Sequence, residues 1–240
     1  MARTAALLII GNEILTGKIQ DANVAYLARE LFDAGVSLRR VVVCPDEVEI
    51  IASDINALRE AHDVVITSGG VGPTHDDVTL QGVALAFGKR LQRSDDIARM
   101  LRTWYGDRIT DDHLRMADVP EGADLVQNEA VPWPTVLMGN VYVFPGVPEL
   151  LQLKFPVVRE RIRGAAPFVS RAVYVQSDEG EIASALEIVA RSHPTVLIGS
   201  YLRWRDPERR LKLTVDGNDA SAVERAVADL VRALGDKVVD

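Results

Sequence analysis

The sequence predicts an α/β fold with three layers, α/β/α, around a mostly parallel sheet, followed by a small α+β module at the C-terminus. Apolar runs at 6–10 and 63–67 are typical of strands that are covered on both faces. Segments with helical spacing of apolar residues alternate with them, as in parallel sheets. The length of 240 residues, 48% of them hydrophobic, is enough for one large domain and a small appendage.

The first half of the chain is expected to alternate regularly between strands and helices. Helix starts and stops are assigned from apolar spacing and from glycine, which commonly follows a helix C-terminus. The expected elements are a strand at 6–10, a polar loop at 11–21, a helix from about Asn23 to Gly35, a strand at 36–44, a helix at 47–61, a strand at 63–67 and a helix at 77–87.

The second half is expected to contain shorter elements. Ser94 is a suitable N-cap for a helix over 95–106. Short strands follow over 123–144, with a turn at 138–140, and then a strand-to-helix unit near 143–155 and a linker at 164–167. The tail reads as a strand (170–175), a helix (179–190), strands at 195–200 and 210–215, and a helix at 219–234. The predicted domains are 1–165 and 168–240.

Composition and charge limit the classes of partner. The net charge of −8 and pI near 5.1 disfavour nucleic-acid binding through a broad basic surface. The arginines of 203–210 are interrupted by acidic residues, as in a solvated hairpin loop. No run approaches the ~20 apolar residues of a membrane span, and the N-terminal segment is too short for a secretory signal. A single cysteine, Cys44, favours a reducing cytoplasmic location and reads as a small buried hydrophobe.

A glycine-rich loop after the third expected strand is the first candidate site. It runs from Ser68 and contains Gly69, Gly70 and Gly72, which let the backbone approach a ligand and direct several N–H groups at an anion. The positive end of the next helix, expected near residue 77, would add to this. Thr74 can donate its hydroxyl to a phosphate or cap that helix. A plain strand-to-helix turn is the alternative for such a loop taken alone.

Two adjacent carboxylates, Asp76 and Asp77, lie in the same loop. Carboxylates repel a phosphate unless a cation intervenes, and Mg²⁺ commonly bridges the two. Asp76 and Asp77 are therefore candidate metal ligands. Two other interpretations remain open: one aspartate can grip the amino–imino edge of a heterocycle, or either can cap the following helix.

The loop after the first expected strand is the second candidate site. It contains Gly11, Glu13, Gly17, Asp21 and Asn23. Loops that follow neighbouring parallel strands meet at one edge of the sheet, where ligands bind. Its acidic residues can complete an oxygen-rich metal site or bind ribose hydroxyls. Alternatively Asp21 and Asn23 cap the first helix, a role that does not explain Glu13.

A third motif, Pro145-Gly146-Val147-Pro148, is by itself a strand-to-helix turn with Pro148 in the first helical turn. The four histidines share no metal-ligand spacing, and only His75 falls in a candidate loop. No G-x-S-x-G, Walker A or C-x-x-C motif occurs, which removes the corresponding enzyme classes.

Three motifs together resemble a known family. They are GNEILTG-x3-DAN at 11–23, TSGGVGPTHDDVT at 67–79 and FPGVPELL at 144–151. Their order and spacing resemble the molybdopterin-binding domain of the MoaB/Mog type, and more closely the N-terminal part of competence/damage-inducible protein A (the CinA family). The resemblance covers roughly residues 4–165. The tail from 170 resembles the small module that follows in that family, and no counterpart of its amidohydrolase domain is expected.

The resemblance implies a dimeric or trimeric protein that binds a pterin or a nucleotide at these loops. It places Asp77 against the pterin or the metal, and Gly69, Gly70, Gly72 and Thr74 around phosphate. In CinA relatives, and in the similar domain fused to eukaryotic FAD synthase, it implies a metal-dependent pyrophosphatase acting on ADP-ribose or FAD. The sequence departs from the family pattern at 129–140, which reads EAVPWPTVLMGN where the family has an Ala-Pro-Gly segment.

Three functions are therefore considered for this sequence. Two of them use the candidate site, and the third is a role as a structural or regulatory partner protein. The first is hydrolysis of a nucleotide diphosphate with Mg²⁺, Mn²⁺ or Co²⁺; the second is binding of molybdopterin or a nucleotide without hydrolysis. Asp77 and Asp76 are the expected catalytic residues, and Asp76, Asp77 and Glu13 the expected metal ligands. The ligand-binding residues are expected to be Ser68, Gly69, Gly70, Gly72, Thr74, Gly11, Glu13, Gly17, Asp21, Asn23, Pro145 and Gly146.

Overall fold

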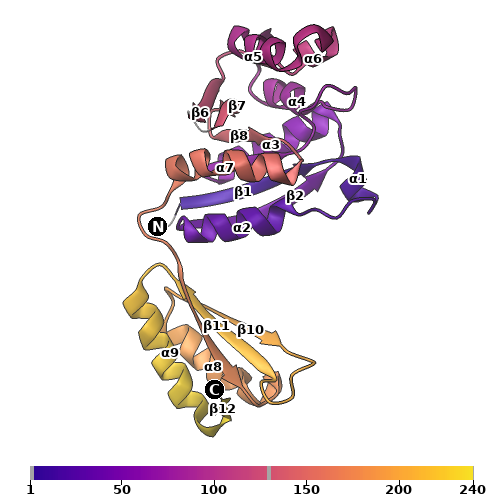
Figure 1. The fold of residues 1–240 in the computed structure, drawn as a ribbon. Helices are drawn as coiled ribbons and strands as arrows, with labels where there is room; N and C mark the ends of the chain where they lie inside the picture. Colours follow the sequence, from indigo (N-terminus) through magenta and orange to yellow (C-terminus); the bar gives the residue numbers. More distant parts are fainter. Residues whose placement is uncertain (1–2, 129–130, 240) are drawn as a thin grey trace. The chain divides into compact units, whose positions relative to one another are not determined.

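A computed structural model gives the structure of residues 3–128 and 131–239. Within them the chain divides into two units, one ending at Gly164 and the other beginning at Ala165. Figure 1 shows the first unit as a sheet between helices and the second as a smaller sheet with two helices.

The elements of the first unit follow the predicted alternation of strands and helices. Its strands are β1 (Arg3–Ile10), β2 (Val36–Cys44), β3 (Val64–Ser68), β4 (Leu91–Arg93), β5 (Asp118–Pro120), β6 (Asp124–Asn128), β7 (Val131–Met138) and β8 (Val141–Phe144). Its helices are α1 (Asn12–Leu15), α2 (Asn23–Asp33), α3 (Val48–Ala61), α4 (Thr79–Ala86), α5 (Asp95–Tyr105), the 3₁₀ helix η1 (Gly106–Arg108), α6 (Asp111–Arg115) and α7 (Pro148–Ile162).

The main sheet is mostly parallel, as predicted. Its strand order is β2-β1-β3-β8-β7-β6. Strands β2, β1, β3 and β8 are parallel, whereas β7 runs antiparallel to both β8 and β6. The predicted turn at 138–140 joins β7 to β8. The carboxyl ends of three neighbouring strands, β1, β3 and β8, therefore lie side by side at one edge of the sheet.

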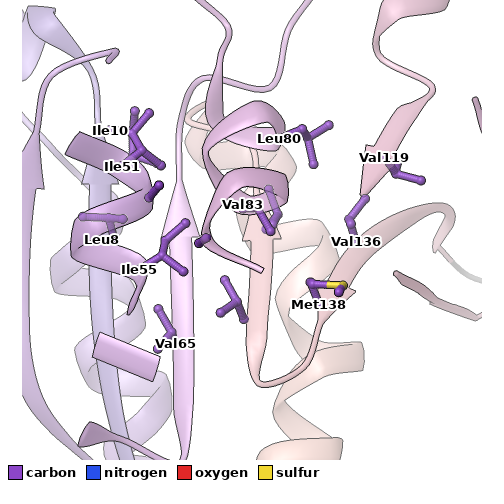
Figure 2. Packing of buried hydrophobic residues seen from close by; sticks show 14 of the residues in the cluster. Leu8, Ile10, Ile51, Ile55, Val65, Leu80, Val83, Val119, Val136 and Met138 are labelled. Atoms are coloured by element: carbon purple, nitrogen blue, oxygen red, sulfur yellow. The ribbon is translucent and has the colours of Figure 1, made fainter. Parts of the chain in front are cut away.

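Alternate residues of β1 face two separate cores. Leu8 and Ile10 point toward α3, α4 and α5, where they pack in a cluster with Ile51, Leu80 and Val83 (Figure 2). Their neighbours in the strand face the other core, between the sheet and helices α2 and α7. A fully buried leucine or isoleucine contributes about 1.5–3 kcal/mol, so both faces of the sheet stabilise the fold. The structure confirms the three-layer α/β/α architecture.

The second unit is a small α+β module. It contains β9 (Val169–Val175), α8 (Glu179–Ser192), β10 (Leu197–Leu202), β11 (Leu211–Gly217), α9 (Ala220–Leu234), the 3₁₀ helix η2 (Gly235–Lys237) and β12 (Val238–Val239). The sheet is antiparallel, in the order β10-β11-β9-β12. Both α helices contribute to its apolar core. The arginine-rich segment at 203–210 connects β10 to β11, as expected for a hairpin loop.

Some element boundaries differ from those predicted. The polar loop at 11–21 contains one helical turn, α1, and the helix expected at 77–87 begins only at Thr79. The short strands β4, β5 and β12 were not predicted. Very short strands carry little periodic signal, because two or three residues cannot show an alternating pattern. Within the described residues no helix is both long and apolar enough to cross a lipid bilayer.

Lys154 on α7 is buried, and its Nζ atom donates a hydrogen bond to the Pro134 carbonyl oxygen at 2.7 Å. Burial lowers the pKa of this ammonium group to about 8. The unfolded chain, in which the pKa of a lysine is about 10.4, therefore binds more protons between pH 8 and 10. We expect the free energy of unfolding to rise with pH across this window, by roughly 3 kcal/mol at most.

This pH dependence is measured by urea denaturation at several pH values. Lys154→Met removes the ionisable group and is expected to flatten the rise, while the unpaired Pro134 carbonyl costs about 1–3 kcal/mol at all pH values. Lys89→Met, at an exposed lysine, is the matched control and should keep the wild-type slope. An equally steep rise in Lys154→Met would assign the effect to other groups.

Candidate functional site

The candidate loops come together at the carboxyl edge of the main sheet. The residue pairing of β1 with β3 places Ile9 beside Ser68, so the loops that follow these strands are neighbours. The backbone N–H of Gly69 donates to the Phe144 carbonyl oxygen at 3.1 Å, which joins the third motif to the glycine-rich loop. The prediction that these loops share one edge is confirmed.

Asn23, in the first turn of α2, connects three of these segments. Its Nδ2 atom donates to Ser68 Oγ at 2.9 Å and to the Gly146 carbonyl oxygen at 2.8 Å. Ser68 Oγ in turn donates to the Pro145 carbonyl oxygen at 3.3 Å. The Asn23 side chain is buried, and its Oδ1 atom has no partner among the described residues. Asn23 therefore holds the loops together and does not cap the helix.

Gly69 allows the loops to approach closely. Its φ angle is +109°, and a Cβ atom added there would lie 2.1 Å from the backbone oxygen of Ile10. A Cβ at Gly146 would lie 3.3 Å from the Gly69 Cα atom. Only glycine fits such a position without moving backbone. Because the Gly69 N–H is already bonded to Phe144, this residue shapes the loop and donates nothing to a ligand.

The next three residues leave their amide groups available. In the described part of the chain, no acceptor is found for the backbone N–H groups of Gly70, Val71 and Gly72. Thr79 fixes this turn from behind, because its N–H donates to the Gly70 oxygen at 3.0 Å and its hydroxyl to the Gly69 oxygen at 2.8 Å. Consecutive unpaired amides in a turn form an anion-binding concavity.

Thr74 gathers both aspartates of the loop. Its hydroxyl oxygen lies 2.5 Å from Asp76 Oδ1 and 2.6 Å from Asp77 Oδ2, and its N–H also donates to Asp77 Oδ2 at 2.8 Å. The hydrogen bond from the Thr74 hydroxyl, and after it one from the backbone N–H of Asp76 itself, lower the pKa of the Asp76 carboxyl. The N-cap residue of α4 is Val78, which makes no side-chain capping bond. Neither aspartate caps the helix, and nor does Thr74.

The residues with unpaired amides line a pocket. Gly70, Val71, Gly72 and Asp77 line it together with Leu80 and Gln81 of α4. Four further lining residues come from a later part of the chain: Leu91, Arg115, Met116 and Asp118. None of these four was predicted from the sequence. They come from a part of the chain that carries no glycine-rich loop, and its aspartate pairs, Asp95-Asp96 and Asp111-Asp112, lie in the first turns of α5 and α6, so no local signal marks the four.

Comparison with known proteins identifies the family. Residues 6–164 match the model of the probable molybdopterin binding domain. The chain belongs to this molybdopterin-binding domain family. Residues 167–240 match a second model, the middle domain of FAD synthase. The expected resemblance of the tail to a small module that follows this domain agrees with that match.

Several relatives of this molybdopterin-binding family member are similar over most of its length. A protein of Archaeoglobus fulgidus is 33% identical over 96% of this chain and 98% of its own. A probable FAD synthase of Caenorhabditis elegans is 30% identical over 99% of this chain, which spans about half (51%) of that relative. A CinA-like protein of Myxococcus xanthus is 34% identical over 92% of this chain and 56% of its own.

A solved structure is also similar to the molybdopterin-binding domain. It is the crystal structure of the protein CinA, of unknown function, from Thermoplasma acidophilum, with a TM-score of 0.62 and 31% sequence identity. It covers 67% of this chain and 98% of that chain. The resemblance to CinA that the three motifs suggested is confirmed.

The acidic pair of this molybdopterin-binding domain fits a metal that is shared with a ligand. Mg²⁺ is often held by one or two carboxylates together with substrate phosphates. The single proton of the Thr74 hydroxyl can serve only one of its two carboxylate neighbours, and a cation between the aspartates would relieve the remaining oxygen–oxygen repulsion. Within residues 3–128 and 131–239, no group of three His, Cys, Asp or Glu side chains is placed to hold a metal by itself.

The remaining predicted residues take other positions. The Glu13 carboxylate folds back over Gly11, where an added Cβ would lie 2.5 Å from Glu13 Oε1, so in this conformation it completes no three-ligand set with the aspartates. Asp21 Oδ1 accepts a hydrogen bond from the Val24 N–H at 2.8 Å, in the first turn of α2. This agrees with the alternative interpretation, in which Asp21 caps the helix. Gly17 has φ +68° and no neighbour within 4 Å of an added Cβ. His75 is almost fully exposed.

The divergent segment at 129–140 falls partly outside the described residues. Positions 129 and 130 are not described, and the rest of the segment forms all of β7 and the turn into β8. Thr135 is buried there, next to Val136, which belongs to the core between the sheet and helices α3, α4 and α5. In the described residues the segment therefore forms part of the main sheet, where β7 pairs with β6 and β8.

Proposed function

We propose that the N-terminal domain binds a nucleotide diphosphate at the Gly70–Gly72 amides and hydrolyses its pyrophosphate bond with the help of a divalent metal ion. The observation that carries the proposal is the placement of two carboxylates, Asp76 and Asp77, on one hydroxyl beside three unpaired amides. Amides alone bind an anion, whereas carboxylates alone repel it. The combination is typical of a site where metal and phosphate are bound together.

Each group has a definite role in this proposal. The amides of Gly70, Val71 and Gly72 donate to phosphoryl oxygens and stabilise the charge that develops on them. Asp76 and Asp77 would hold Mg²⁺, Mn²⁺ or Co²⁺, which would supply positive charge to the phosphate and lower the pKa of an attacking water. Thr74 fixes both carboxylates through its hydroxyl and its N–H. Gly69 and Asn23 hold the loop in shape.

The relatives support a nucleotide as the ligand. The C. elegans relative is named a probable FAD synthase, and residues 167–240 match the middle domain of FAD synthase. Both point to an enzyme that acts on a nucleotide. ADP-ribose and FAD are the proposed substrates, because each contains a diphosphate between two organic groups and the pocket offers both unpaired amides and apolar side chains, Val71, Leu80, Leu91 and Met116.

A second candidate function is binding of molybdopterin or a nucleotide without hydrolysis. It is favoured by the hydrogen bonds from Thr74, which already engage both aspartates with protein groups. Calorimetry with pterin and nucleotide ligands distinguishes the two functions. Affinity that survives a metal chelator, together with no turnover on any dinucleotide, would select the binding protein.

Asp77→Asn tests the proposed hydrolase. The variant keeps an oxygen that can accept from Thr74 but loses the negative charge that holds the metal. We expect hydrolysis of ADP-ribose to AMP and ribose 5-phosphate to fall by roughly 100-fold or more, as when a charge-stabilising group is removed from an active site. The measurement is a screen of Mg²⁺, Mn²⁺ and Co²⁺ against ADP-ribose and FAD, with wild type and variant side by side.

Asp33→Asn is the matched control, since Asp33 is an exposed carboxylate at the end of α2. It should keep the wild-type rate with each metal, and chelation should abolish the rate of both proteins. If wild type cleaves no dinucleotide pyrophosphate with any of the three metals, the hydrolase proposal is wrong.

A further inference from the structure

The pocket has a second wall that the proposed function does not use. This wall comes from residues 91–118, which run from β4 through α5 and α6 to β5. Arg115, the last residue of α6, lines the same pocket as Gly70, Gly72 and Asp77. Figure 1 shows α5 and α6 beyond α4, on the side away from α2. A cationic residue from a distant part of the sequence thus shares the pocket with the anion-binding turn.

The wall is held firmly against the domain. Ile97 and Leu101 of α5 are buried in the core that also contains Leu8 of β1. Thr110 begins α6 with a capping box, in which its side chain accepts from the His113 N–H and the His113 side chain accepts from the Thr110 N–H. The His113 ring also stacks on Tyr105, with 3.9 Å between ring centroids. The backbone that carries Arg115 is therefore preorganised, which lowers the entropic cost of binding a ligand there.

The charges of the pocket leave Arg115 available for an anion. Of the two carboxylates in the lining, Asp118 is engaged by Arg93, whose Nε and Nη2 atoms donate to its oxygens at 2.7 and 2.9 Å. Among the residues placed in the structure, Arg115 has one ion-pair contact, a long one of 3.7 Å from its Nη1 atom to Asp112 Oδ1 one helical turn away. Exposed pairs of this kind contribute little. A guanidinium has five donors in a planar fork that matches two phosphate oxygens.

We propose that Arg115 binds a phosphoryl oxygen of the ligand in the pocket that it lines together with Gly70–Gly72 and thereby sets the preference for diphosphate ligands. The inference rests on the proposed function for the identity of the ligand. The amides hold one end of the diphosphate, and the guanidinium holds it from the other side. Leu91 and Met116 line the same wall and contact an organic group of the ligand, which favours a substituted diphosphate over inorganic pyrophosphate.

Arg115→Gln tests the inference. The side chain stays long and polar but loses its charge and its fork of donors. We expect the KM for ADP-ribose to rise roughly 10- to 100-fold, the range that follows from losing a hydrogen bond to a charged group, with a smaller change in kcat. Arg115→Lys, which keeps the charge without the fork, should recover part of the affinity. If the protein binds ADP-ribose without cleaving it, Kd from calorimetry takes the place of KM.

Two control variants separate ligand binding from a structural role. Arg99→Gln removes another exposed arginine with an i,i+3 aspartate partner, at 3.1 Å on α5, and should leave the KM unchanged. Asp112→Asn breaks the one ion pair that Arg115 makes with the residues that the structure describes and should leave the KM unchanged or lower it. A rise in KM with Asp112→Asn equal to that with Arg115→Gln would show that Arg115 acts through Asp112 and overturn the inference.

The possible failures are distinguishable. If wild type binds and cleaves ADP-ribose and Arg115→Gln does so with an unchanged KM, the inference is wrong and the proposed function stands. If wild type neither binds nor cleaves ADP-ribose, the proposed function is wrong, and the inference that rests on it is overturned as well.

Discussion

Replacing Gly69 by alanine is expected to lower the free energy of unfolding by about 3 kcal/mol or more and to abolish ligand binding, because backbone strain and overpacking add at this position. The φ angle of +109° is unfavourable for any residue with a Cβ atom, and the new methyl group would lie 2.1 Å from the Ile10 carbonyl oxygen. Since that neighbour is backbone, the clash is relieved only by separating the ends of β1 and β3. Urea denaturation and calorimetry with ADP-ribose measure the two losses.

Gly122→Ala is the matched control for Gly69→Ala. Gly122 also has a positive φ angle, +83°, but nothing lies within 4 Å of an added Cβ. It isolates the cost of the backbone conformation, about 1 kcal/mol, and should leave ligand affinity unchanged. Equal destabilisation by the two substitutions would mean that the approach of Gly69 to Ile10 does not limit the structure of the site.

The sheet and the position of the candidate loops could be predicted because they depend on local patterns and one general rule. The segment 36–44 forms β2 with the predicted boundaries, since its strand signal is long and a glycine and a proline bracket it. The rule that ligands bind outside the carboxyl ends of parallel strands then brought residues 11–23 and 68–77 together. The two loops are in direct contact, because the Asn23 side chain donates a hydrogen bond to Ser68 Oγ.

The roles of individual polar side chains in these loops were harder to predict. Several interpretations of Thr74, Asp76 and Asp77 were open because each residue type can cap a helix, bind a ligand or pair locally. The choice depends on where the next helix begins. It begins at Thr79, so Val78, and neither aspartate, occupies the N-cap position.

Arg115 could not be predicted as a pocket residue from the sequence. The anion-binding residues of the same pocket, Gly70–Gly72 and Asp77, are more than 30 positions away from it along the chain. Their proximity depends on how α5 and α6 pack on the sheet, and tertiary packing of this kind leaves no periodic signal near Arg115 itself. A lone arginine at the end of a short polar helix reads as a solvated side chain.

Asn23→Asp is the second substitution for which we expect a large effect. The Asn23 amide donates two hydrogen bonds from a buried position, to Ser68 Oγ and to the Gly146 carbonyl oxygen. A carboxylate cannot donate to either acceptor, and neither of these hydrogen-bond partners of Asn23 is a cation that would compensate the buried charge. We expect the free energy of unfolding to fall by about 3–5 kcal/mol at pH 8, the usual cost of an uncompensated buried charge.

The pH dependence identifies the cause of this loss. Burial raises the folded-state pKa of the new carboxyl above its unfolded value near 4, so the folded state takes up a proton as the pH falls toward 5. The difference in stability between variant and wild type should therefore shrink from pH 8 to pH 5 in urea denaturation. A protonated carboxyl can donate one of the two lost hydrogen bonds, so part of the loss persists.

Asn218→Asp provides the control for this substitution. Asn218 is exposed in the C-terminal unit, and the same change there should alter stability by less than about 0.5 kcal/mol, as is usual for surface substitutions. A loss in Asn23→Asp that stays constant between pH 8 and pH 5 would attribute the effect to the missing hydrogen bonds alone. A loss as small as that of the control would show that Asn23 does not hold the three loops together, because the loops would then keep their arrangement without its amide.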